Sequence, residues 1–409
     1  MSLVVQKFGG TSVADPERIQ EVAAHVVRTR EEGHEVVVVV SAMGKTTDEL
    51  LQLAHEISPN PHRRELDMLQ TAGERISTAL LCIAIWDRGV PATSLTGSQA
   101  GIVTDAAHGR AKIIEVKADR LREALGAGHV VVVAGFQGVS VTRDITTLGR
   151  GGSDTTAVAL AAALQADVCE IYNDVAGVYT ADPRVVPNAR MLRSTTYEEM
   201  LDIADTGGRV LALRAVEFAR NYNVPLHVRS SFTWEPGTWI GKETEDMEQP
   251  VISAISHDTS EAKVTVQAVP DSPGIAARLF RPLADQGINV DMIVQNTSVH
   301  GTTDISFTVP MADLPTGLKV TEEVAGDIGA QQVTHDTEIG RVSLVGAGMK
   351  TNPGIAAQVF EVLADEGINV EMISTSTIVI SCVVRASAVE PAVRALHEAF
   401  ELGEIMESG

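Results

Sequence analysis

The sequence predicts an α/β protein in which a large domain with a mostly parallel sheet precedes two smaller ferredoxin-like modules. Over the first 230 residues, short apolar runs rich in valine alternate with helical patterns, which is typical of a sheet with helices on both faces. Further along, the stretch from Pro273 to Ile293 occurs a second time, with few changes, from Pro353 to Ile373. The total of 409 residues allows two or three domains, each with its own hydrophobic core.

The first strand and helix of the large domain have clear signals. Leu3 to Phe8 is an apolar run of strand length, and Asp15 followed by Pro16 is a typical helix start. Apolar residues then recur at helical spacing as far as Gly33, which ends the helix. By the same criteria, further buried strands are predicted at Glu35–Ser41, His129–Ala134, Val168–Tyr172 and Pro225–Val228, and helices at Glu65–Trp86, Ala157–Leu164 and Ser194–Ala204.

The two repeats share one predicted order of elements. Each copy follows a strand, supplies a helix and a second strand, and precedes a third strand and a final helix. This β-α-β-β-α-β order is ferredoxin-like. Before the first repeat, a Pro-Gly pair and an acidic run interrupt the periodicity, which indicates a linker. We therefore expect a domain over residues 1–230, a linker over 231–261, and modules over 262–336 and 337–409.

The composition excludes several classes of function. A formal net charge of −22 argues against nucleic acid or an anionic membrane as the main partner. Cys82, Cys169 and Cys382 are scattered in apolar runs, so we expect reduced core residues and no zinc or redox site. The N-terminus has no signal-peptide pattern, and no apolar run reaches the ~18 residues needed to cross a bilayer. We expect a cytoplasmic protein.

A glycine-rich loop before a predicted helix is the most informative motif. Residues 147–158 read TLGRGGSDTTAV, so Arg150 lies among Gly149, Gly151 and Gly152. Glycine lets a backbone approach an anion closely, and Ser153 is a suitable N-cap. An arginine can hold a carboxylate or phosphate with two parallel hydrogen bonds. The loop therefore indicates a site for a small anion beside a phosphate, although an ordinary glycine-rich turn fits the same residues.

Two further motifs follow predicted strands. Lys7, Gly9 and Gly10 end the first strand, where a lysine and backbone N–H groups can meet phosphate oxygens. Ser41 ends the second strand, and Thr47 lies at the start of the next helix, where hydroxyl groups suit contact with a substrate. A plain Gly-Gly turn and a strand-to-helix turn with a threonine cap would explain these residues as well.

Two more stretches contain polar residues that chemistry could use. Residues 173–184 follow a buried strand and include Asp174, Tyr179 and Asp182, which could frame the base and ribose of a nucleotide. Any long surface loop would have a similar composition. Glu74 lies inside a predicted helix, where a lone glutamate is normally a solvated residue.

Taken together and in this order, the motifs KFGGTS, SAMG with TTDEL, TAGERIS, GSQAG, TLGRGGSDTTA and NDVAGVYTADPR resemble those of the aspartate kinases of the amino-acid kinase superfamily. The tandem repeat is similar to the paired ACT domains of these enzymes, and the resemblance covers about residues 2–403. It implies a three-layer α/β/α amino-acid kinase (carbamate-kinase-like) domain followed by two ACT domains. It also implies transfer of the γ-phosphoryl group of ATP, bound with Mg²⁺, to the side-chain carboxylate of L-aspartate. The product, 4-phospho-L-aspartate, leads towards lysine, threonine and methionine.

The resemblance implies roles for individual residues. Lys7 would stabilise the transferred phosphoryl group, Asp154 would position Lys7, and Arg150 would bind the α-carboxylate of aspartate. Glu74 would pair with the α-ammonium group of aspartate. The rest of the implied substrate site is Ser41, Thr47, Gly151, Gly152 and Ser153, and the rest of the nucleotide site is Gly9, Gly10, Asn173, Asp174, Tyr179, Asp182, Arg184 and Arg209. No metal ligand is expected from the chain. Amino-acid effectors, threonine or lysine, would bind at Asp271, Gly274, Ile275, Asn289, Gln295, Asn369 and Thr377.

Several positions depart from the family pattern. Arg209 stands where a lysine is frequent near the ATP phosphates, and it keeps the positive charge. Ile275 stands where close relatives often have glutamate, and Thr377 and Val379 stand in a segment that usually carries an acid and a base. We therefore expect feedback inhibition by threonine and lysine to be weakened or changed, with unimpaired regulation as the alternative.

Two other functions and the assembly stay open at this point. The chain could phosphorylate another amino acid or an aspartate analogue in a specialised pathway, or it could be a non-catalytic paralogue that senses amino acids. Intact Lys7, Glu74, Arg150 and Asp154 count against the second alternative. Because ACT domains usually pair across subunits, we expect a homo-oligomer.

Overall fold

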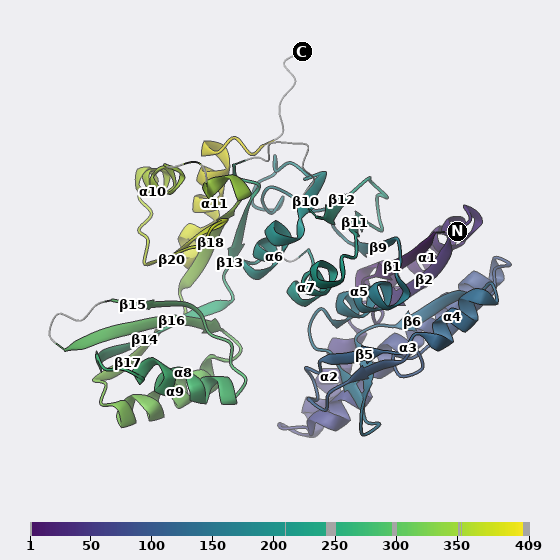
Figure 1. The fold of residues 1–409 in the computed structure, drawn as a ribbon, viewed down its shortest axis with the longest axis horizontal. Coiled ribbons are helices and arrows are strands. Elements are labelled where there is room, and N and C mark those ends of the chain that lie inside the picture. The colour runs from purple at the N-terminus through teal and green to yellow at the C-terminus, as the bar shows by residue number, and fades with distance from the viewer. Residues whose placement is uncertain are drawn as a thin grey trace, which may run out of the picture. The chain divides into compact units, whose positions relative to one another are not determined.

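The computed structural model describes residues 2–208, 210–242, 251–296, 301–350, 352 and 354–403 (Figure 1). The chain forms two compact units. The first comprises Met1–Tyr179, Met191–Asp205 and Arg209–Met247, and the second comprises Thr180–Arg190, Thr206–Gly208 and Glu248–Gly409. The segment Thr180–Arg190 therefore leaves the first unit in mid-sequence and packs with the second.

An eight-stranded sheet forms the centre of the first unit, in the order β10-β12-β11-β9-β1-β2-β6-β3. Neighbouring strands from β11 to β3 are parallel, whereas β12 is antiparallel to β11. The strands are β1 (Leu3–Phe8), β2 (Glu35–Val40), β3 (Ala92–Leu95), β6 (Val130–Ala134), β9 (Val168–Asn173), β10 (Ser194–Thr196), β11 (Leu226–Ser230) and β12 (Thr238–Gly241).

Helices cover both faces of this sheet. Val36, Val38 and Val40 of β2 pack in one hydrophobic cluster with residues of α1 and α3, whereas α5 contacts β1, β2 and β9 and packs against α7. Because side chains alternate along a strand, Val37 and Val39 are buried on the opposite face. The helices are α1 (Pro16–Glu31), α2 (Thr46–Ile57), α3 (Arg63–Asp87), α4 (Asp119–Gly126), α5 (Gly152–Leu164), α6 (Tyr197–Asp205) and α7 (Leu213–Tyr222), with a short 3₁₀ turn η1 (Gly10–Val13).

A second, four-stranded sheet in the first unit has the order β5-β4-β7-β8. Its strands are β4 (Ile102–Thr104), β5 (Ile113–Val116), β7 (Gln137–Ser140) and β8 (Ile145–Thr147). Strand β8 leads directly into the glycine-rich loop, so this small sheet positions the start of that loop.

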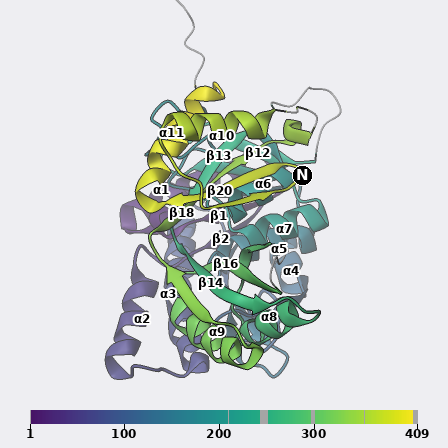
Figure 2. The same cartoon turned by 90° about the vertical axis from the view of Figure 1, so that its left-hand side faces the viewer.

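The first repeat module in the second unit has the predicted β-α-β-β-α-β order. Its elements are β14 (Glu261–Pro270), α8 (Ile275–Asp285), β15 (Asp291–Gln295), β16 (Thr302–Pro310), α9 (Leu314–Ile328) and β17 (Gln332–Asp336). They form the sheet β15-β16-β14-β17, and helices α8 and α9 lie on one side of it (Figure 2). Apolar residues of the two helices pack in one cluster with those of the sheet.

The sheet of the second repeat module includes one strand from outside its repeat. Strand β13 (Ala254–Asp258), which precedes the first module, pairs with β18 and completes the sheet β13-β18-β20-β19. The remaining elements are β18 (Ile339–Val345), η2 (Ala347–Lys350), α10 (Ile355–Asp365), β19 (Met372–Thr375), β20 (Val379–Arg385), η3 (Ala386–Ala388) and α11 (Val389–Ala399). The first module is therefore inserted between two parts of the second.

Two details differ from the sequence predictions. The segment 231–261, expected to be a linker, contains β12 of the large sheet and β13 of the second module. The helix predicted at Ser194–Ala204 begins only at Tyr197, because Ser194–Thr196 pairs with β12 as an edge strand. Both differences come from pairing with residues distant in sequence, which local periodicity does not report.

Two expectations about composition can be compared with the described residues. Cys82, Cys169 and Cys382 are free and buried, as predicted. Among the described helices, none has the length and apolar character that crossing a membrane requires.

Candidate active site

The carboxyl ends of three neighbouring strands, β1, β2 and β9, bring predicted motifs to one edge of the large sheet. In the register of the sheet, Phe8 at the end of β1 lies beside Val40 of β2 and Tyr172 of β9. The loops that follow are tied together by their backbones. Gly9 N–H donates to Tyr172 O at 3.2 Å, and Ser41 N–H donates to Phe8 O at 3.1 Å. Ligands in parallel α/β sheets bind at this edge.

Lys7 and Asp154 form an ion pair at this edge. Lys7 Nζ lies 2.6 Å from Asp154 Oδ1, and both side chains are almost fully buried. Lys7 Nζ also donates to Asn173 Oδ1 at 3.4 Å, and Asn173 Nδ2 in turn donates to Val210 O at 2.8 Å. The pair joins β1 to the first turn of α5, so the ammonium group of Lys7 has a fixed position.

Gly10 is constrained by the neighbouring loop. A Cβ atom at Gly10 would lie 2.9 Å from Ala42 O and 3.2 Å from Gly44 O. Gly44 N–H donates to Gly10 O at 3.1 Å, which holds the two loops together. The backbone after β1 can therefore pass close to the loop after β2 only because residue 10 has no side chain.

The glycine-rich loop adopts conformations that require glycine. Gly149 and Gly151 have φ values of 81° and 71°, and a Cβ atom at Gly151 would lie 2.3 Å from Ala212 Cβ. Gly151 is the residue that precedes α5, without a side-chain cap, so the prediction that Ser153 caps this helix is wrong. Gly152 N–H donates to Gly149 O at 2.9 Å, and the start of α5 presents the positive end of the helix, which favours an anion.

Ser153, inside this first turn, instead contacts the loop after β2. Ser41 Oγ donates to Ser153 Oγ at 3.1 Å. Thr47 lies in the first turn of α2 and is half-buried. Hydroxyl groups from two different helices and one strand end therefore lie in or beside these loops.

Arg150 projects into solvent from the same loop. Its side chain is exposed, and within the described part of the chain it makes no hydrogen bond or ion pair. An arginine held on a rigid loop without a protein partner retains all its N–H donors for a carboxylate or phosphate.

Glu74, on α3, is a buried carboxyl group with an unused oxygen. Only 3% of the residue is exposed, and Oε2 has no hydrogen-bond partner among the described residues. Burial raises the pKa of Glu74 to about 7, although hydrogen bonds from backbone amides oppose the shift. A buried carboxylate normally has a cationic or hydrogen-bonding partner, so this oxygen is suited to an ammonium group supplied by a ligand.

The residues predicted for the nucleotide do not all lie in one unit. Asn173 and Tyr179 belong to the first unit, and Asp174 there is exposed. Asp182 and Arg184 belong to the second unit, where Arg184 Nη2 lies 2.6 Å from Asp182 Oδ2. Arg209 lies outside the described residues.

The predicted effector residues lie in the repeat modules. Gly274 precedes α8 with φ 92°, and Ile275 is buried in the core of the first module. The others are exposed: Asp271, Asn289, Gln295, Asn369 and Thr377.

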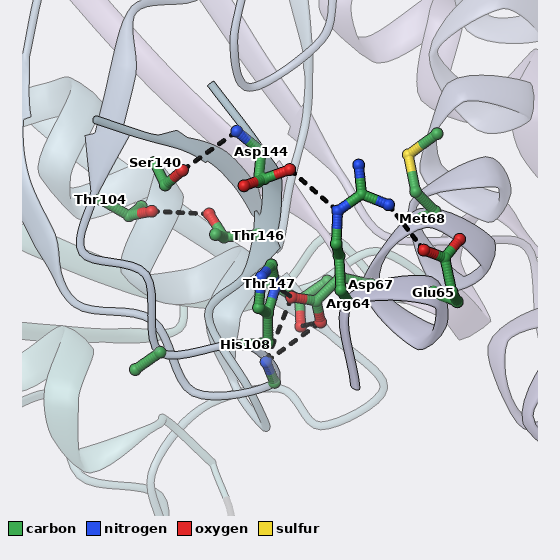
Figure 3. A network of polar contacts seen from close by, with 12 residues as sticks. Arg64, Glu65, Asp67, Met68, Thr104, His108, Ser140, Asp144, Thr146 and Thr147 are labelled. Carbon is green, nitrogen blue, oxygen red and sulfur yellow. Dashed lines mark hydrogen bonds and ion pairs between the residues drawn. The ribbon is translucent and has the colours of Figure 1, made fainter. Parts of the chain in front are cut away.

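Sequence reasoning missed one polar residue near the glycine-rich loop. Asp67, on α3, is fully buried and accepts hydrogen bonds from His108, Gly109 and Thr147 (Figure 3). The available signal was its position seven residues before Glu74, which places both carboxyl groups on one face of the same helix.

The chain matches known families over most of its length. The model of the amino acid kinase family matches residues 2–230, and that of the ACT domain matches residues 263–324 and 342–400. The aspartokinase of Mycolicibacterium smegmatis is 56% identical over 408 residues, which cover 98% of this chain and 97% of that protein.

Solved structures resemble the chain as well. Aspartokinase III of E. coli in complex with aspartate and ADP, in its R-state, is 27% identical with a TM-score of 0.84. The same enzyme in complex with lysine and aspartate, in its T-state, has a TM-score of 0.73 at the same identity. The match to the R-state covers 97% of this chain and 99% of the other, as does the match to the T-state.

Proposed function

Because the chain belongs to the amino acid kinase family and, within it, to the aspartokinases, we propose that the groups around Lys7, Glu74 and Arg150 form its active site. The chain is an aspartokinase: it phosphorylates the side-chain carboxylate of L-aspartate at the expense of ATP, on the route to lysine, threonine and methionine. The observation that carries the assignment of the site is the conjunction of a buried, unpartnered carboxylate oxygen on α3 with an exposed, unpartnered arginine on the glycine-rich loop.

Glu74 and Arg150 would hold the two charged groups of the amino acid that do not react. Glu74 pairs with the α-ammonium group, which supplies the partner that its buried oxygen lacks. Arg150 binds the α-carboxylate with two parallel hydrogen bonds, and the positive end of α5 stabilises the negative charge. Ser41, Thr47 and Ser153 line the remainder of the substrate site. A dicarboxylate without an ammonium group would leave Glu74 unpaired, so this arrangement selects an amino acid.

Lys7 would stabilise the phosphoryl group during its transfer. A side-chain oxygen of aspartate attacks the γ-phosphorus, and the bond from phosphorus to the bridging oxygen of ADP breaks. The nucleophile is already ionised, so no general base is needed, and catalysis consists of alignment and neutralisation of charge. Asp154 and Asn173 hold Lys7 Nζ in place, and the amides of Gly9 and Gly10 are available to phosphate oxygens.

The nucleotide would be bound with Mg²⁺. The described residues contain no group of three or more histidine, cysteine or acidic side chains that could form a protein-built metal site. Mg²⁺ is commonly bound through substrate phosphates with only one or two carboxylates. Asn173, Asp174 and Tyr179 of the first unit are the proposed contacts of the nucleotide. Asp182 and Arg184, which belong to the second unit, and Arg209, outside the described residues, stay predictions from the family resemblance.

The ACT modules would regulate the enzyme through amino acids such as lysine or threonine. A lysine complex is known for the related E. coli aspartokinase III. The proposed effector site includes Asp271, Gly274, Asn289, Gln295, Asn369 and Thr377. Because Ile275 is buried in the core and carries no charge, we propose that feedback inhibition is weaker than in relatives with glutamate there. We further propose a homo-oligomer formed through the ACT modules, located in the cytoplasm.

Acyl-phosphate formation tests the proposed site. Hydroxylamine traps 4-phospho-L-aspartate as a coloured iron complex, and the KM for aspartate can be measured for Arg150→Ala beside Arg120→Ala, an exposed arginine of α4 that serves as the control. We expect Arg150→Ala to raise the KM on the order of a hundredfold, because it removes a charge-assisted bidentate contact. Equal KM values for the two variants would contradict the proposed site. Initial rates with added lysine and threonine, alone and together, test the proposed loss of regulation, and strong inhibition at low effector concentration would contradict it.

A further inference from the structure

We propose that Asp67, His108, Gly109 and Thr147 form a clamp that sets the position of Arg150 relative to Glu74 and thereby determines recognition of the amino-acid substrate. The proposal rests on the active site proposed above. None of these four residues contacts the reacting groups in the proposed mechanism, so they are positioning residues. We call them the Asp67 clamp (Figure 3).

The centre of the clamp is a carboxylate whose acceptor positions are filled. Asp67 is fully buried. Oδ1 accepts from Thr147 Oγ1 at 2.6 Å, and Oδ2 accepts from His108 Nδ1 at 2.6 Å. The N–H of Gly109 donates to both oxygens, at 3.1 and 3.2 Å. Hydrogen bonds to an ionised acceptor are stronger than neutral ones, and a buried carboxylate that loses a donor keeps its desolvation cost.

Both segments held by Asp67 adjoin the glycine-rich loop that carries Arg150. Thr147 is the last residue of β8, three positions before Arg150. Gly109 lies under the loop, because a Cβ atom on Gly149 would come within 3.1 Å of Gly109 O. The two segments are also joined by Ala111 N–H, which donates to Thr147 O at 2.9 Å.

Arg214 of α7 fastens the same two segments from another side. Its Nη1 donates to Leu148 O at 3.1 Å, and its Nη2 donates to Ala111 O at 2.9 Å. The base of the loop is therefore fixed at residues 147 and 148, and Arg150 follows two residues later.

Asp67 and Glu74 lie on one face of one rigid helix. Seven residues correspond to almost two full turns, so the two carboxyl groups are separated by about 10 Å along the axis. Glu74 contacts the ammonium group directly, whereas Asp67 holds the loop that bears the arginine for the α-carboxylate. A single helix thus fixes the distance between the two groups that recognise the amino acid, and loosening the clamp should weaken aspartate binding without affecting ATP.

Two adjacent buried threonines provide a matched test. Thr146 and Thr147 are both fully buried on β8, but the Thr146 hydroxyl bonds Thr104 Oγ1, whereas the Thr147 hydroxyl bonds Asp67. Replacement by valine keeps the shape and removes the hydroxyl in each case. We expect Thr147→Val to raise the KM for aspartate on the order of ten- to a hundredfold while the KM for ATP stays within about twofold, since small displacements of a binding group have large effects. Thr147→Ser should restore the KM, and Thr146→Val should leave both KM values within about twofold of the unaltered protein.

A second pair of variants covers the case in which Thr147→Val does not fold. His108 is partly exposed, so His108→Ala is better tolerated, and it removes one donor to Asp67. His108→Asn retains a nitrogen donor close to the position of Nδ1. We expect the KM for aspartate to rise with alanine and to return towards its original value with asparagine. Melting temperatures measured in parallel separate general destabilisation from loss of positioning.

The outcomes distinguish this proposal from the active-site assignment. If Thr147→Val and Thr146→Val lower the melting temperature alike and leave the KM for aspartate unchanged, while Arg150→Ala and Glu74→Gln raise it, the clamp has only a structural role. If none of these four variants alters the KM for aspartate, the proposed active site itself is wrong.

Discussion

Substitution of Glu74 by glutamine should abolish a specific pH dependence of aspartate binding. Because burial raises the pKa of Glu74 to about 7, the free enzyme at neutral pH is a mixture of the neutral and ionised carboxyl group. Only the ionised form can pair with the α-ammonium group of aspartate. The ammonium group and the carboxylates of aspartate itself do not titrate between pH 6 and 8, so the change in binding over this range reports on the enzyme.

The expected magnitude follows from the fraction of Glu74 that is ionised. With a pKa of about 7, this fraction is about a tenth at pH 6 and about nine tenths at pH 8, so the KM for aspartate should be roughly tenfold higher at pH 6. Removing one charge of a buried pair costs about 2–4 kcal/mol, which corresponds to a rise in the KM of Glu74→Gln of roughly 30- to 700-fold at pH 8. Because glutamine does not titrate, the KM of this variant should be almost independent of pH.

Initial rates across the pH range provide the assay. ADP formation is followed with coupling enzymes in excess, at saturating ATP, and the KM for ATP is determined at each pH because the γ-phosphate also titrates there. The variant serves as the control, since any pH dependence that comes from ATP or the coupling enzymes appears in both proteins. The reasoning is refuted if the unaltered protein has a constant KM for aspartate from pH 6 to 8, or if Glu74→Gln retains the same slope.

Three further predictions concern other parts of the first unit. Asp154→Asn should lower kcat on the order of a hundredfold and the free energy of unfolding by about 3 kcal/mol, because Lys7 would remain buried without its ionic partner. An unchanged kcat would contradict the role of this ion pair. Gly10→Ala should abolish most activity, because its Cβ would lie 2.9 Å from Ala42 O. The control Gly126→Ala, with open space around the new Cβ, should keep activity and gain up to about 1 kcal/mol of stability. Steady-state rates measure the activity of both variants, and urea denaturation measures their stability. Burial lowers the pKa of His25 to about 4, so below pH 6.5 the unfolded chain binds a proton that the folded protein does not. The contribution of His25 to the free energy of unfolding is therefore complete above pH 6.5 and is lost as the pH falls towards 4, by at most about 2 kcal/mol at pH 5. Between pH 7.5 and pH 5, the free energy of unfolding measured in urea titrations should fall less for His25→Gln than for the unaltered protein.

The elements that local periodicity predicts are largely those that bury one apolar face. The strand Leu3–Phe8 is found with its predicted bounds, and the helix predicted after Asp15 extends over Pro16–Glu31, with Asp15 accepting from Arg18 N–H. These segments combine a clear apolar pattern with a recognisable start. The repeat likewise predicted the element order of the first module, whereas the second module takes its fourth strand, β13, from upstream of the first module.

Features that depend on distant pairing were not predictable in this way. Ser153 looked like a helix cap because its residue type favours that position, but Gly151, two residues earlier and in a left-handed conformation, is the residue that precedes α5. Asp67 looked like an ordinary polar residue of an amphipathic helix, since its donors come from residues 41 and 80 positions away along the chain. In both cases the deciding feature depends on the folded structure, so no periodic pattern in the sequence indicates it.

The strand β13 makes the second ACT module discontinuous in sequence, with the first module inserted between β13 and β18. A fragment that starts after Asp258 lacks the edge strand of the second sheet and would expose the backbone groups of β18. The two modules are further joined by Arg341, which pairs with Glu261 and Asp291. The consequence is that the two modules cannot be separated by one cut between them, and a regulatory fragment has to begin upstream of Ala254 to keep the second sheet whole.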